Sequence, residues 1–120
     1  MIDISVYKFI HIVGVAAVVL ALGGAILGTF VTGSKPAATR KLIAITHGVG
    51  LFLVILGGFG MLARLGINWP WPGWVIVKVI AWLLLGAFLS LAYKKKDAHL
   101  SIWFGTLALV AIAAASAIFK

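Results

Sequence analysis

Four long runs of apolar residues, separated by short polar connections, dominate the pattern of this chain. The runs cover residues 9–33, 42–63, 74–93 and 98–119, and Lys78 is the one full charge inside them. A helix needs about 20 predominantly apolar residues to cross a hydrocarbon layer roughly 30 Å thick. The pattern therefore predicts an all-α fold, an integral membrane four-helix bundle of up-down topology with short loops. We expect its helices near residues 5–33, 41–65, 74–94 and 98–119.

Composition supports a membrane protein. Of the 120 residues 64% are hydrophobic and 10% are charged, whereas a soluble domain has about 25% charged residues. The connections are too short for a soluble domain, so we expect a single membrane domain over residues 1–120. The N-terminal stretch has no basic region and no small-residue cleavage site, which predicts a retained helix and not a signal peptide. Cysteine is absent, which excludes disulfides and thiolate chemistry.

The basic residues predict the orientation of the chain. The net charge is +8, but these side chains cluster at the ends of the apolar runs, where headgroup contacts are expected and nucleic-acid binding is not. The 1–2 and 3–4 connections hold six of the ten: Lys35, Arg40, Lys41, Lys94, Lys95 and Lys96. The opposite side holds Lys8, Arg64, Lys78 and Lys120. Because Lys and Arg favour the cytoplasmic side, both termini are predicted in the periplasm, with the chain in a bacterial cytoplasmic (inner) membrane.

Small residues and tryptophans indicate how the helices meet and where they end. Each predicted helix has glycine, alanine or serine at close-packing spacing, which favours contact within or between subunits. The connection over residues 66–74 has two prolines and three tryptophans; it is expected to be a rigid interfacial anchor, with a docking surface as the alternative. An offset of 36 relates His11-x-Val13-Gly14 to His47-x-Val49-Gly50. Such a repeat would be inverted in the membrane, and coincidence explains it equally well.

Ionisable residues inside a span are costly, so each is a candidate functional site. Counted from the midpoint of its run at 1.5 Å per residue, His11 is predicted about 15 Å toward the periplasm and His47 about 8 Å toward the cytoplasm. This separation of roughly 20 Å in depth prevents the two from binding one iron. His47 and His99 are predicted within about 6 Å in depth.

Two clusters follow from these depths. His47 and His99, near Arg40, Lys41 and the lysines at 94–96, could ligate a b-type haem whose propionates bind the basic residues. His11 gathers with Lys8, Arg64 and Lys78, a cationic pocket suited to an anionic ligand. His47, His11 and His99 are thus the candidate metal ligands. The alternative for each residue is structural, as a packing histidine or a cation that reaches the headgroups.

Several short motifs are similar to known families. The residues Arg40-x6-His47, Gly57-Gly58, Trp74-x3-Lys78 and Leu85-Gly86 resemble the small four-span SirB-type membrane proteins. The segment Lys8-x2-His11-Ile12, together with Trp74-x3-Lys78, resembles the HemJ-type protoporphyrinogen oxidases. Both look like one broad group with the CopD-type copper-resistance proteins.

These resemblances imply different functions. The HemJ-like one implies haem b binding and porphyrinogen oxidation, with His11 and Lys78 at matching positions. This chain departs from that pattern, because it is shorter and has no second histidine at the matching point late in the third helix. The SirB-like one implies no established activity. Two methionines and no cysteine count against copper.

The leading hypothesis is a small membrane protein that binds haem b or a related porphyrin in a redox or tetrapyrrole-related role. Its ligand would be His47 or His11, with Arg64, Lys78, Arg40 and Lys41 as partners for carboxylates. The alternative is a cofactor-free accessory subunit of a larger membrane complex. Homo-oligomers are also expected from the small-residue faces. The spans hold no pair of carboxylates, which argues against a proton or cation pump, and no catalytic residue is assigned.

Overall fold

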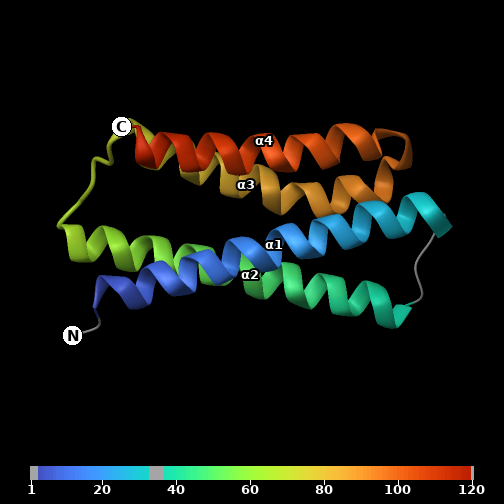
Figure 1. The fold of residues 1–120 in the computed structure, drawn as a ribbon, viewed down its shortest axis with the longest axis horizontal. Helices are drawn as coiled ribbons and strands as arrows, with labels where there is room; N and C mark the ends of the chain where they lie inside the picture. Colours follow the sequence, from blue (N-terminus) through green and yellow to red (C-terminus); the bar gives the residue numbers. More distant parts are fainter. Residues whose placement is uncertain (1–2, 33–36, 120) are drawn as a thin grey trace.

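The computed structural model describes residues 3–32 and 37–119, and within these residues the secondary structure is helical. The helices are α1 (Ile4–Thr32), α2 (Ala37–Leu65), α3 (Gly73–Lys94) and α4 (His99–Ile118), with a short 3₁₀ helix, η1 (Lys96–Ala98), before α4. They run up and down side by side (Figure 1). Each of the four α-helices contains a stretch long and apolar enough to cross a membrane. The predicted all-α bundle of four helices is confirmed.

The helix bounds differ from the prediction chiefly at α2. It begins at Ala37, whereas the apolar pattern placed its start at residue 41. The pattern marks where apolar side chains begin, and a helix can continue beyond that boundary through polar residues such as Thr39 and Arg40. Residue 33, the predicted end of the first helix, lies outside the described residues.

The end of α2 is fixed by local hydrogen bonds. Gly66 has a φ of +72°, a conformation that glycine adopts without a steric penalty. The N–H of Gly66 donates to the carbonyl of Ala63, and the N–H of Ile67 donates to that of Leu62. This is the Schellman arrangement, which satisfies carbonyls that the last turn leaves without partners. The chain therefore leaves the helix at Gly66, as the proline-containing connection requires.

Glycines bring α1 and α2 into backbone contact. A Cβ atom placed on Gly14 would lie 2.8 Å from the carbonyl oxygen of Gly50, and one placed on Gly50 would lie 3.0 Å from that of Gly14. These two glycines are the pair related by the 36-residue offset, so they face each other where the antiparallel helices cross. A Cβ on Gly57 would lie 2.6 Å from the backbone nitrogen of His11. The interface is closed to anything larger than a hydrogen atom at these points.

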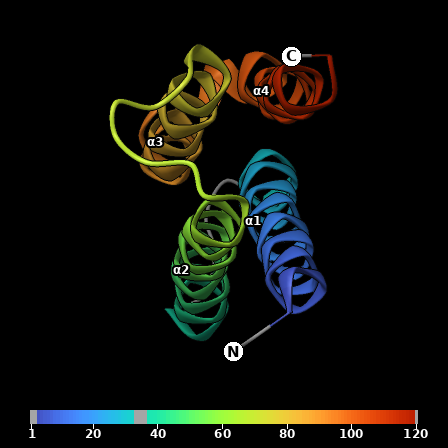
Figure 2. The same ribbon diagram turned by 90° about the vertical axis from the view of Figure 1, so that its left-hand side faces the viewer.

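The second half of α1 forms the centre of the core. Figure 2 shows the α1–α2 pair lying against the α3–α4 pair. α1 contacts each of the other three helices, whereas the described residues of α2 and α4 make no contact with each other. The buried core residues are Val18, Ala21, Leu22, Ala25 and Ile26 of α1, with Ile43, Ala92 and Ile102 from the other helices. Many large apolar side chains remain exposed on the outer faces, as expected where lipid surrounds a bundle.

Candidate functional site

His11 is half-buried on α1 and binds the backbone of α2. Its Nδ1 lies 2.9 Å from the carbonyl oxygen of Val54. A carbonyl only accepts hydrogen bonds, so Nδ1 carries the proton and Nε2 of the neutral ring keeps its lone pair. The Nδ1–Cε1 edge of the ring faces Gly58. The bond to Val54 therefore fixes the ring so that Nε2, the basic nitrogen, points away from that carbonyl.

Lys78 lies near the start of α3, at the same end of the bundle as His11. It is half-buried, whereas Lys8 and Arg64 are exposed at the same end of the bundle. All four members of the predicted cationic cluster thus lie toward one end of the bundle, and His11 and Lys78 are the two that are partly buried. Lys8 and Arg64 lie on the outer faces of α1 and α2.

His47 is buried, with 4% of its surface exposed, and it joins α2 to α3. Its Nε2 lies 3.1 Å from the carbonyl oxygen of Leu85, so Nε2 donates the hydrogen bond and Nδ1 holds the lone pair. Trp82 makes the reciprocal contact, because its Nε1 donates to the carbonyl of Leu51 at 3.0 Å. Two ring N–H groups therefore tie α2 to α3.

Sequence reasoning missed Trp82. Trp69 and Trp71 lie in the 2–3 connection and Trp74 in the first turn of α3, whereas Trp82 lies well inside its span. An indole N–H in the interior of a bundle needs an acceptor, and that position alone was a signal that it binds a neighbouring helix.

The depth predicted for the two histidines needs correction. The backbone nitrogen of His11 lies level with Gly57 of α2, ten residues from His47, which is about 15 Å along the helix at 1.5 Å per residue. The separation is shorter than the predicted value of roughly 20 Å because the prediction centred each run separately, whereas the crossing of Gly14 and Gly50 sets the real register. Two ligands of one iron lie within about 4 Å of each other, twice a metal–nitrogen bond. His11 and His47 still do not share a metal.

His99 does not join His47. It begins α4, which makes no contact with α2 in the part of the chain that the structure describes; the Nε2 of His47 is directed to α3 instead. Within residues 3–32 and 37–119, no group of three or more His, Cys, Asp or Glu residues could hold a metal ion.

The other end of the bundle is basic. The guanidinium carbon of Arg40 lies 4.3 Å from the centroid of the Tyr93 ring, which joins the first turns of α2 to the last turn of α3. Lys41, which follows Arg40, and Lys94 and Lys95, which follow Tyr93, are exposed. Lys35 and Lys120 lie outside the described residues, and so does the side chain of Lys96.

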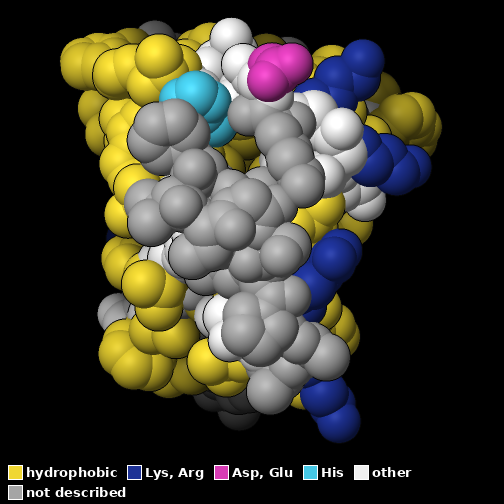
Figure 3. Space-filling model, turned by 90° about the vertical axis from the view of Figure 1, so that its right-hand side faces the viewer, with side chains coloured by type: hydrophobic (Ala, Val, Ile, Leu, Met, Phe, Trp, Pro, Cys, Tyr) yellow, Lys and Arg dark blue, Asp and Glu magenta, His cyan; other side chains and the backbone are white. Residues whose placement is uncertain are grey.

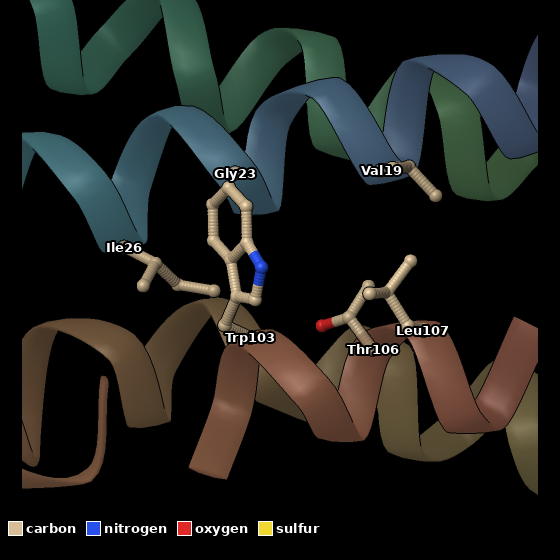
Figure 4. Close-up of a pocket in the computed structure, with 6 residues that line it drawn as sticks. All are labelled: Val19, Gly23, Ile26, Trp103, Thr106 and Leu107. Atoms are coloured by element: carbon tan, nitrogen blue, oxygen red, sulfur yellow. The ribbon is translucent and has the colours of Figure 1, made fainter. Parts of the chain in front are cut away.

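A small apolar pocket lies between α1 and α4 (Figure 4). Its volume is about 70 Å³, and its lining residues are Val19, Gly23, Ile26, Trp103, Thr106 and Leu107. Sites for ligands of drug size measure about 300–1,000 Å³. The pocket contains none of the predicted site residues, and it is far too small for a porphyrin.

Comparison with known proteins adds no relative. No family model matches the chain, and no match is found among curated proteins or among solved structures. The likeness to the SirB, HemJ and CopD groups therefore depends on the short motifs alone.

Proposed function

We propose that this chain is a multi-pass protein of the bacterial inner membrane that binds haem b or a related porphyrin through His11. The orientation of the His11 ring carries the proposal. A histidine that ligates a metal almost always donates its other ring N–H to a carbonyl or carboxylate, which fixes the tautomer and raises the basicity of the ligating nitrogen. His11 has this arrangement, with Nδ1 bound to the carbonyl of Val54.

The structure favours His11 over His47 as the ligand. The Nε2 of His47 is engaged by Leu85 and the whole side chain is buried, so a metal could reach it only after that bond broke. In His11 it is Nδ1 that binds the carbonyl of Val54, so the lone pair of Nε2 is not used by that bond, and the ring is only half-buried. The sequence left the two as equal candidates, and the proposal now names one of them.

The residues around His11 suit the rest of a haem. Lys78 of α3 and Arg64 of α2 lie at the same end of the bundle as His11. Both are suitable partners for propionates, because hydrogen bonds between charged groups are stronger than those between neutral groups. A macrocycle does not fit between α1 and α2, which the glycines close; it would bind on the side of His11 where Lys78 lies. The bound group would supply one-electron redox chemistry.

A reduced-minus-oxidised absorption spectrum tests the proposal. The protein would be produced in cells supplied with haem precursor and purified in mild detergent. We expect the sharp reduced band of a b-type haem at a stoichiometry near one haem per chain. A flat spectrum from well-folded protein, with no haem retained after reconstitution, would contradict the proposal.

A cofactor-free accessory subunit is the second candidate, and one observation favours it. The His11, His47 and Trp82 rings all bind backbone carbonyls of neighbouring helices, which is what packing residues within a membrane do. In that case the histidines hold the bundle together and the chain acts through a partner. A flat spectrum together with a stoichiometric co-purifying membrane protein would support this role.

A further inference from the structure

Basic side chains form a row along one edge of the end that carries the α3–α4 turn (Figure 3). The described members of this basic row are Arg40 and Lys41 at the start of α2 and Lys94 and Lys95 at the end of α3. Viewed from this end, the dark-blue side chains follow one side, while the single acidic side chain and the histidine lie at the top. The positive charge is thus concentrated on the α2–α3 side of the bundle.

Arg40 is the organised member of the basic row. Its guanidinium stacks on the ring of Tyr93 at 4.3 Å from the centroid, and Tyr93 packs against the hydrophobic core. Stacking on an aromatic face stabilises a guanidinium and leaves its N–H groups at the edge of the plane. A planar fork held in this way matches the two oxygens of a phosphate.

The row has little acid to balance it. The chain has two carboxylates; Asp3 precedes α1 at the opposite end, and Asp97 lies in η1. Four described cations therefore face one carboxylate at this end. Lys94, Lys95 and Asp97 line an open hollow together with Ala98 and Ser101. The remaining positive charge favours the binding of an anion from outside the chain.

Apolar side chains continue the row along the outside of α2. Below Lys41, at helical spacing, follow Ile45, Val49 and Phe52, which are 53%, 51% and 62% exposed. Residues three and four apart share a face of a helix. A cation at the top of an exposed apolar stripe matches a molecule with an anionic head and a hydrocarbon tail.

We propose that the basic row is a binding site for an anionic phospholipid, with its phosphodiester on Arg40 and its acyl chains along α2. The site lies at the opposite end of the bundle from His11, so it does not depend on haem binding. It assigns Arg40 and Lys41 to a lipid phosphate, not to the propionates for which the sequence made them candidates.

Native mass spectrometry of the detergent-purified protein tests this site. The protein is incubated with equal amounts of phosphatidylglycerol and phosphatidylcholine that have the same acyl chains. We expect preferential retention of phosphatidylglycerol, and about a fivefold loss of that preference in Arg40→Gln, the change expected from one interfacial cation. Lys8→Gln, which removes an exposed cation at the other end, is the matched control and should keep the preference.

Two further variants separate the ring of Tyr93 from its hydroxyl. Tyr93→Phe keeps the aromatic face under Arg40 and should retain the preference. Tyr93→Leu removes the face and should weaken the preference about as much as Arg40→Gln. Arg40 is exposed, so its variant should fold and remain informative even if Tyr93→Leu does not.

Three results would overturn the proposal. Equal retention of the two lipids by the wild-type protein would show no headgroup selectivity. An unchanged preference in Arg40→Gln would remove the central residue. Displacement of phosphatidylglycerol by the same concentration of inorganic phosphate would show a site for free phosphate, in which the acyl chains and the α2 stripe take no part.

Discussion

Gly57→Ala is expected to destabilise the α1–α2 pair by about 1–3 kcal/mol, the usual cost of forcing extra atoms into a packed interface. The new Cβ would lie 2.6 Å from the backbone nitrogen of His11 and 2.6 Å from the carbonyl oxygen of Tyr7. Both contacts are with backbone, so no side-chain rotation relieves them. The helices must separate, and van der Waals contact is a principal attraction between helices in lipid.

Gly48→Ala is the matched control on the same helix. A Cβ at Gly48 meets nothing within 4 Å, and alanine is favoured over glycine in a helix interior by about 1 kcal/mol. Unfolding in mixed micelles of increasing dodecyl sulfate content, followed by circular dichroism, measures both variants. We expect Gly57→Ala to unfold at a lower dodecyl sulfate fraction than wild type and Gly48→Ala at an equal or higher one. Equal stability of the two variants would contradict the glycine contact between α1 and α2.

The histidine variants are expected to differ sharply from each other. His11→Ala removes the proposed ligand and should abolish haem binding. His47→Ala should keep the b-type spectrum and lose about 0.6 kcal/mol of stability, the average measured for hydrogen bonds between membrane helices, with a maximum of about 1.7 kcal/mol, because it breaks the bond to Leu85. Absorption spectra and the mixed-micelle assay together measure both effects. If His47→Ala lost the haem and His11→Ala kept it, the two assignments would have to be exchanged.

The helices could be predicted from the sequence because the bilayer constrains the chain so strongly. A spanning segment must be apolar over its whole length and must satisfy its own backbone hydrogen bonds, so four apolar runs gave four helices. The early start of α2 at Ala37 was missed, since polar residues outside the apolar run can still be helical. The tight turn at Gly66 fits a glycine that precedes a proline-containing connection.

The candidate site could be predicted only in part. The residue types pointed to His11, Lys78 and His47, but their relative depth depends on the register at which α1 and α2 pack. That register is set by the contact between Gly14 and Gly50, one of many small-residue pairs that the sequence allowed. The protonated nitrogen of each histidine depends on which carbonyl it meets in space, Val54 or Leu85. No pattern in the sequence contains that information.

Rescue of a His11→Gly variant by free imidazole is the decisive test of His11 as the haem ligand. Glycine leaves the position of the ring open, so added imidazole can occupy it and supply the missing nitrogen. We expect no reduced b-type band in the purified variant, and a band that appears when haem and imidazole are added together. A band in His11→Gly without imidazole, as strong as that of the wild-type protein, would show that His11 is not the ligand.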